Sequence, residues 1–138
     1  MNREAVDQVY IDPSYEVFCD DRLFDMSDVV LNRDGQLEPL GRLRDVLAQK
    51  GIEIHTADFL SGGRSGGASR DYYSLGLLDN YRKLATRDDI RLRAFIVMEP
   101  PVVSPKLYWA LPELTRTFDE VYVHNVSGDG YSLKGVDR

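Results

Sequence analysis

Residues 94–98 (Ala-Phe-Ile-Val-Met) form an uninterrupted apolar run with no polar position on either face. Successive side chains of a β-strand point to opposite faces of the sheet, so a strand with this pattern is covered on both sides. Burial on both faces is typical of a strand inside a parallel sheet that carries helices above and below it. The run therefore indicates a central strand of a parallel sheet.

Strand-like and helix-like patterns alternate along the rest of the chain. Strands are predicted at 9–11, 52–56, 72–75, 92–98 and 121–123, and helical spacing at 37–50, 77–85 and 104–111. In the first helical segment one face is expected to carry Leu37, Leu40, Leu43, Val46 and Leu47, and Gly51 is expected to end the helix. Pro112 is expected to kink or restart the last helix. Irregular segments are expected at 14–34 and at the glycine-rich 61–69. The alternation predicts an α/β fold: one Rossmann-like domain over 1–138, with an open, mostly parallel sheet of about five strands and helices on both faces.

The amino-acid composition limits the classes of binding partner and the cellular compartment that are expected for this chain. The chain has 17 Lys+Arg against 23 Asp+Glu, a formal net charge of −6, which argues against nucleic acid as the partner. A single cysteine, Cys19, excludes an internal disulfide framework. No signal peptide and no apolar run near the ~18 residues of a membrane span are present, so a cytoplasmic protein without an integral membrane segment is expected.

Chemistry is expected where the strands end. In open parallel sheets, ligands bind outside the carboxyl ends of the strands. Five segments follow predicted strands in this way: 12–15, 56–59, 75–76, 99–103 and 124–127. These segments hold the candidate site residues.

Glu99 is the most distinctive candidate. It follows the buried strand directly and precedes Pro100-Pro101, which stiffen the turn after it. Partial burial raises the pKa of a carboxyl group and suits it to act as a general base. An equally weighted interpretation is that Glu99 caps the next helix or accepts hydrogen bonds from nearby backbone amides.

Other patterns have simpler structural explanations. The glycine-rich segment lacks the lysine of a phosphate-binding loop and is predicted to be a surface loop. Cys19 with His55 or His124 as base is less favoured than a buried cysteine, and no metal-ligand spacing occurs. His124-Asn125 suits sugar hydroxyls, although two polar residues at a strand end are the favoured interpretation. Trp109 at helical spacing is predicted to lie in the core rather than to stack on a sugar ring.

Residues 98–108 (Met-Glu-Pro-Pro-Val-Val-Ser-Pro-Lys-Leu-Tyr) resemble the strand–Glu–Ser/Pro–x–x–x–Pro segment of family-ten glycosyltransferases, the α-1,3/α-1,4-fucosyltransferases. Residues 118–123 resemble the Phe-Asp strand entry that follows in that family. Residues 50–58 also resemble the second-strand segment of its bacterial members. The similarity covers most of the chain and is most specific around Glu99.

The resemblance implies a function as well as a fold. In that family two Rossmann-like domains face a cleft, the GT-B arrangement. The N-terminal half binds the glycan acceptor and the C-terminal half binds GDP-fucose. The match is to the N-terminal half, so it implies an acceptor-binding domain whose donor-binding domain lies outside this chain. A GDP-sugar donor is then a partner of the complete enzyme.

Catalysis in the family is inverting and needs no metal or other cofactor. By this resemblance, Glu99 would deprotonate the acceptor hydroxyl, which displaces GDP at the anomeric carbon of fucose. Asp12, Tyr15, Asp58, His124 and Asn125 are the expected acceptor-binding residues. The absence of the membrane anchor carried by animal members implies a bacterial, cytoplasmic enzyme.

Two alternatives remain open. Nothing after Val123 resembles the donor half, which favours a stand-alone, non-catalytic Rossmann-like module that binds a glycan or a protein. A flavodoxin-like regulatory domain is less favoured, because no acidic cluster or phosphate loop follows the first strand. An apolar face left by a missing second domain would also allow the chain to form a homo-oligomer.

Overall fold

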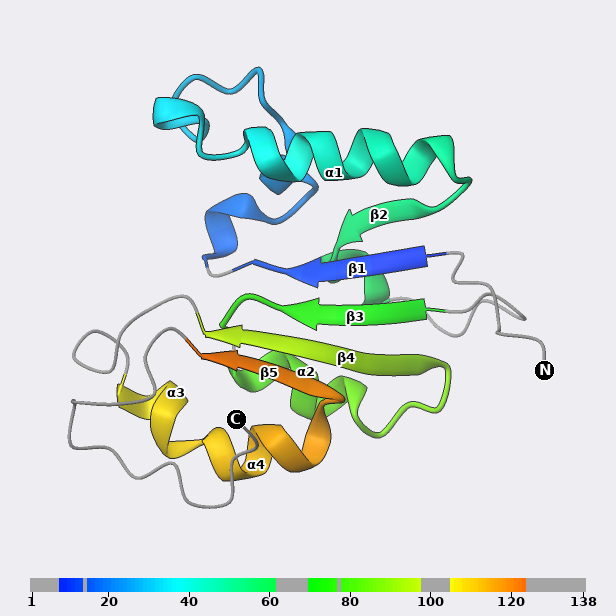
Figure 1. The fold of residues 1–138 in the computed structure, drawn as a ribbon, viewed down its shortest axis with the longest axis vertical. Helices are drawn as coiled ribbons and strands as arrows, with labels where there is room; N and C mark the ends of the chain where they lie inside the picture. The colour runs from blue at the N-terminus through cyan, green and yellow to red at the C-terminus, as the bar shows by residue number, and fades with distance from the viewer. Residues whose placement is uncertain (1–7, 14, 62–69, 77, 98–104, 124–138) are drawn as a thin grey trace.

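The computed structural model describes residues 8–13, 15–61, 70–76, 78–97 and 105–123 (Figure 1). The strands are β1 (Gln8–Asp12), β2 (Glu53–Thr56), β3 (Arg70–Ser74), β4 (Ile90–Val97) and β5 (Glu120–Val123). The α-helices are α1 (Glu38–Gln49), α2 (Leu78–Leu84), α3 (Pro105–Trp109) and α4 (Leu111–Thr117). Short 3-10 helices are η1 (Glu16–Phe18), η2 (Arg22–Phe24), η3 (Arg33–Gly35) and η4 (Ala57–Ser61).

The strands form a single parallel sheet, which confirms the predicted fold class. The order is β2-β1-β3-β4-β5, and every adjacent pair runs parallel. The chain moves outward from β1 to β2, then crosses back past β1 to β3 and continues in that direction. This is a common doubly wound order, and its direction reverses between β1 and β3. Ligands of such sheets bind at that switch point, beyond the carboxyl ends of the two strands.

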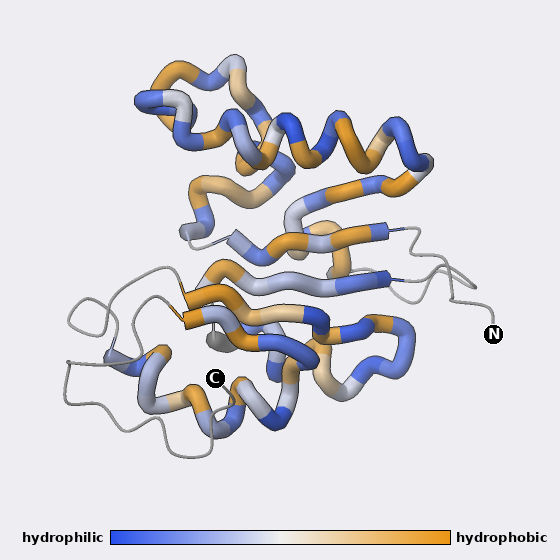
Figure 2. The backbone as a smooth tube through the Cα atoms, in the orientation of Figure 1, coloured by the Kyte–Doolittle hydropathy of each residue, from blue (hydrophilic) through white to orange (hydrophobic). Residues whose placement is uncertain are grey.

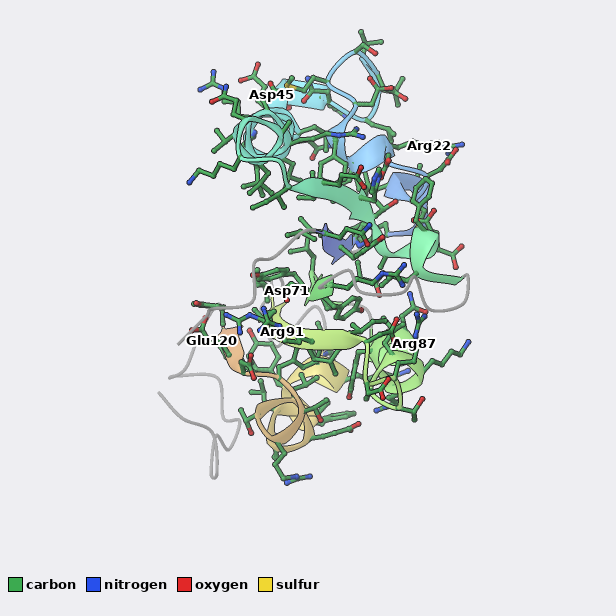
Figure 3. All side chains as sticks on the ribbon, turned by 90° about the vertical axis from the view of Figure 1, so that its right-hand side faces the viewer. Arg22, Asp45, Asp71, Arg87, Arg91 and Glu120 are labelled. Carbon is green, nitrogen blue, oxygen red and sulfur yellow. The ribbon has the colours of Figure 1, made fainter. Side chains whose placement is uncertain are left out.

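Helices cover both faces of the sheet, as predicted. Crossover connections are right-handed, so connections that run in opposite directions along a sheet lie on opposite faces. Accordingly α1 lies on one face and α2 on the other (Figure 3). We call these the α1 face and the α2 face. The α1 face packs Ile11 and Ile54 of the strands against Leu23 and Phe24 of η2.

The α2 face holds the larger, aromatic part of the core. Tyr72 and Phe95 of the strands pack against Tyr81 of α2 and Phe118 after α4. The Tyr81, Phe95 and Phe118 rings meet edge to face with centroids 5.3–6.1 Å apart, the preferred geometry for aromatic pairs. This layer forms the rigid support beneath α2.

Helix α1 follows the predicted pattern with one difference. It ends before Gly51, whose φ of +75° is the left-handed conformation that glycine adopts without strain. Leu40 and Leu47 pack toward the sheet as expected, but Leu43 and Val46 are exposed. The apolar stripe is visible along the helix in Figure 2. At 12 residues α1 is the longest described helix, and no helix in the described ranges has the length and apolar character needed to cross a bilayer.

The break predicted near Pro112 is confirmed, and the placement of Trp109 is corrected. Helix α3 ends at Trp109 and α4 restarts at Leu111, with Pro112 in its first turn. Trp109 is 67% exposed, whereas Leu107 and Tyr108 are buried. Consecutive helical residues are about 100° apart around the axis, so a helix this short cannot bury all three side chains.

Candidate functional site

The predicted site residues fall into two groups. Asp12 ends β1, Tyr15 follows it, and Asp58 lies in η4 after β2, at the carboxyl edge of the sheet. Glu99, His124 and Asn125 lie outside the described residues, as does the glycine-rich segment from residue 62 to 69. Of the first group, Asp12 and Asp58 line a common pocket. Tyr15 is 57% exposed and does not belong to its lining.

Asp12 is buried at the switch point and hydrogen-bonded by neutral groups. Only 1% of its surface is exposed. The Tyr72 hydroxyl donates to Asp12 Oδ2 at 2.5 Å, and Asn80 Nδ2 donates to Asp12 Oδ1 at 3.2 Å. Tyr72 lies on the neighbouring strand, where Asp12 pairs with Ser74, so both side chains point to the α2 face. The Leu75 N–H donates to the Asp12 carbonyl at 2.8 Å and holds the two strand ends together.

Burial controls the acidity of this pair. It raises the pKa of Asp12, an effect that outweighs the hydrogen bonds from Tyr72 and Asn80 and is reinforced by the negative charge of Asp58. Burial, together with the carboxyl group of Asp12, also raises the pKa of Tyr72. Tyr72 therefore stays a protonated donor. Among the described residues no cation contacts Asp12, and a buried carboxyl group with a raised pKa beside a pocket marks a candidate functional site.

A pocket of about 430 Å³ lies between η4 and α2, with Asp12 among its lining residues. This volume is within the range of about 300–1,000 Å³ typical of small-molecule sites. Apolar surface comes from η4 and α2, and polar groups converge from both. The lining residues are Asp12, Cys19, Ala57, Asp58, Leu60, Asn80, Lys83, Leu84 and Arg87.

Both signs of charge border the pocket. Asp58 supplies a carboxylate from η4, and Lys83 supplies an ammonium group from α2. Arg87 serves as a brace: its Nε and Nη2 donate to the two Asp89 oxygens at 3.0 and 2.7 Å, and its Nη1 donates to the Leu60 carbonyl at 2.8 Å. Figure 3 shows Arg87 beside α2, on the opposite side of the sheet from Asp71 and Arg91. These hydrogen bonds of Arg87 connect η4 to the turn before β4 and so hold the η4 side and the α2 side of the pocket together.

The irregular segment after β1 closes one side of the pocket. The Asp20 N–H donates to Asp58 Oδ2 at 3.0 Å. Asp21 and Thr56 exchange two bonds, from Asp21 N–H to Thr56 Oγ1 at 2.9 Å and from Thr56 N–H to Asp21 Oδ1 at 2.8 Å. Asp20 and Asp21 both have φ near +60°, a strained conformation maintained by these contacts. These hydrogen bonds hold the segment in a position where Cys19 lines the pocket.

Among the described residues Cys19 has no histidine beside it to act as a base. Burial and the nearby Asp58 and Asp12 carboxyl groups raise the pKa of its thiol, which keeps it protonated. His55 instead has its Nδ1 2.8 Å from Asp21 Oδ2 and is absent from the pocket lining. His55 borders a separate hollow of about 440 Å³ between α1 and β2. The described residues therefore contain no Cys19–His55 pair.

Sequence reasoning missed the residues contributed by α2. Asn80, Lys83 and Arg87 come from or just after a helix that the sequence marks only by its apolar spacing. Asn80 lies in the first turn of α2, which follows β3 at the carboxyl edge of the sheet. That position is the feature of the sequence that indicates a site residue there. Within the described ranges, no group of three or more His, Cys, Asp or Glu side chains is placed to hold a metal ion.

Comparison with known proteins adds no relative: no family model matches the chain, and neither a curated protein nor a solved structure shows significant similarity to it. The assignment of function therefore rests on the geometry of the pocket and on the motif around Glu99.

Proposed function

We propose that this chain is the acceptor-binding half of an inverting glycosyltransferase that resembles the α-1,3/α-1,4-fucosyltransferases. The observation that carries the proposal is the polar pocket at the switch point of a doubly wound sheet, where Asp12, Asp58 and Asn80 converge. Carboxylate and amide groups on an apolar background suit a glycan, whose hydroxyls both donate and accept hydrogen bonds.

Glu99 has the catalytic role in this proposal. Strand β4 ends at Val97, at the same edge of the sheet as Asp12, and Glu99 is two residues further along the chain. Its carboxylate takes the proton of the acceptor hydroxyl as that oxygen bonds to the anomeric carbon of fucose. The bond from that carbon to the β-phosphate oxygen breaks, and GDP leaves with the electron pair. The donor is held by a second domain.

The test uses the complete enzyme that contains this chain. Glu99→Gln should lower kcat by about 100- to 10,000-fold, because a general base is lost while the shape is kept. The matched control is Glu38→Gln at the exposed start of α1, which should leave kcat unchanged. Transfer of radiolabelled fucose from GDP-fucose to a glycan panel is the measurement. Near-normal turnover by Glu99→Gln would refute the role of Glu99.

A stand-alone glycan-binding module is the second candidate. It is favoured by the composition of the pocket, because Asp58 and Asn80 suit glycan hydroxyls without any contribution from a catalytic base. It predicts saturable glycan binding by residues 1–138 alone and no sugar transfer from any nucleotide sugar. Transfer that depends on Glu99 would exclude it.

A further inference from the structure

Asn80 links the buried Asp12 to the open part of the pocket. Its side chain is exposed and lines the pocket, while its Nδ2 donates to Asp12 Oδ1 at 3.2 Å. Asp12 is 1% exposed and has both carboxyl oxygens engaged, so it offers a ligand almost no accessible surface. The group that meets a ligand at this point is therefore Asn80.

The hydrogen bond to Asp12 sets the orientation of the Asn80 amide. A carboxylate only accepts hydrogen bonds, so Asn80 must turn its NH₂ group toward it. The carbonyl oxygen of Asn80 and its second N–H are then left for the pocket. Tyr72 holds the other oxygen of Asp12 at 2.5 Å, which prevents the carboxyl group from rotating. Tyr72 and Asp12 together fix the orientation of the Asn80 amide, and with it one N–H donor and one carbonyl acceptor that face the pocket.

The charges around the pocket favour a neutral ligand. Asp58 and Lys83 contribute opposite charges, and Arg87 is already neutralised by two hydrogen bonds to Asp89. Both charges line the same pocket, so a charged group on the ligand would be attracted by one of them and repelled by the other. A like-charge contact of this kind is costly in a partly desolvated site. Hydroxyl groups bond to both without such a cost.

We propose that the pocket between η4 and α2 is a subsite for one uncharged pyranose. Two neighbouring hydroxyls of the sugar bond to the Asn80 amide and the Asp58 carboxylate, and its C–H face lies against the partly buried Leu84. Asp12 and Tyr72 are positioning residues that act through Asn80. The choice of a sugar rests on the proposed function above, whereas the choice of pocket and of Asn80 rests on the geometry.

The first experiment maps binding on the whole chain by backbone-amide NMR. The probes are the methyl β-glycosides of glucose, galactose, mannose and N-acetylglucosamine, with methyl β-glucuronide and methyl β-glucosaminide as charged analogues. At least one neutral glycoside should shift the amides of Asp58 and Asn80 saturably. The charged analogues should bind about tenfold more weakly or worse. Equal or tighter binding of either charged analogue would overturn the neutral-ligand assignment.

The second experiment uses variants. Asn80→Ala should weaken binding of the neutral glycoside by at least about tenfold, the equivalent of one hydrogen-bonding group. Gln49→Ala, which also removes an amide side chain but at an exposed position on α1, should have no effect. Asp12→Asn should also weaken binding while the same amides shift, because one of the two acceptor oxygens becomes an NH₂ group that faces the donor of Tyr72 or of Asn80. Unchanged affinity in folded Asn80→Ala would overturn the subsite.

The outcomes separate this subsite from the function it rests on. Binding that shifts amides elsewhere and is insensitive to Asn80→Ala refutes the subsite but leaves a glycan-binding protein. No binding of any neutral glycoside refutes the subsite as well, and fucose transfer by the complete enzyme then decides the function separately. If Asp12→Asn fails to fold, the exposed Asn80→Ala still tests the subsite.

Discussion

Asp12 and Asp71 are both buried in neighbouring strands of the sheet, and they are held in opposite ways. Asp12, on the α2 face, is bonded by the neutral groups of Tyr72 and Asn80. Asp71, on the other face, is 3% exposed and bonded by guanidinium groups: Arg91 Nε lies 2.9 Å away and Arg93 Nε lies 3.5 Å away (Figure 3). The Asp12 carboxyl group borders a pocket, whereas the Asp71 carboxyl group joins β3 to β4.

A bulge in β4 explains why two arginine side chains, Arg91 and Arg93, both reach the Asp71 carboxylate. The register shifts between Tyr72 and Tyr73 of β3, which pair with Leu92 and Ala94 of β4. The extra residue between those two is Arg93, and the bulge brings it to the same carboxylate as Arg91. A charge neutralised in this way stabilises the strand pairing. A buried carboxyl group that has no cation among the described residues lowers stability, which makes Asp12 the candidate for a functional residue and Asp71 a structural one.

The largest expected effect comes from removing both cations of Asp71. Arg91→Ala/Arg93→Ala leaves a buried carboxylate unpaired and should lower the free energy of unfolding by about 3 kcal/mol or more. Urea unfolding followed by circular dichroism measures it. Arg91→Ala alone should cost less, because Arg93 remains. A loss below about 1 kcal/mol for the double variant would show that Asp71 does not depend on these cations.

Removing the hydroxyl that holds Asp12 should have the next largest effect. Tyr72→Phe deletes a fully buried hydrogen bond to a carboxyl group and should cost about 2 kcal/mol. The same substitution in an Asp12→Asn background should cost less, because the acceptor is then a neutral amide. Equal costs in the two backgrounds, measured by a double-mutant cycle, would show that the two side chains are not coupled.

Asp12 should also make stability depend on pH. Burial raises its folded pKa above the ordinary value of 3.8. Folding therefore favours the protonated form, so stability is fully present below pH 3.8 and falls as the pH rises through the folded pKa. The loss is about 1.4 kcal/mol for each unit of pKa shift. Asp12→Asn has no group that titrates at this position, so its free energy of unfolding relative to wild type should rise with pH over that interval. A flat or falling difference would contradict the raised pKa.

The smallest expected effect is that of salt. The side chains of Arg91 and Arg93 are 43% and 42% exposed, so 1 M NaCl should screen part of their attraction to Asp71. The cost of Arg91→Ala/Arg93→Ala should then fall by up to about 1 kcal/mol. The cost of Tyr72→Phe should not change, because that side chain is buried. Equal salt dependence of both would remove the distinction between the two aspartates.

The candidate site could be predicted only in part. Asp12 and Asp58 were expected at the carboxyl edge because each follows a predicted strand, and both line the pocket. Tyr15 met the same criterion but lies outside the lining, since strand position does not determine where an exposed side chain points. Asn80 was missed because the hydrogen bond that gives it a role joins residues 68 positions apart.

Local patterns determined the elements of this protein: the strand inside 94–98, the stop at Gly51 and the restart near Pro112 all follow from side-chain period and backbone restriction. The tertiary structure alone decided the strand order and the neighbours of each buried acid. Asp12 meets Tyr72, 60 residues away, only because the chain crosses back past β1 to form β3. A strand pattern records which residues are buried, whereas the partner of a buried carboxyl group depends on which strands and helices lie next to it.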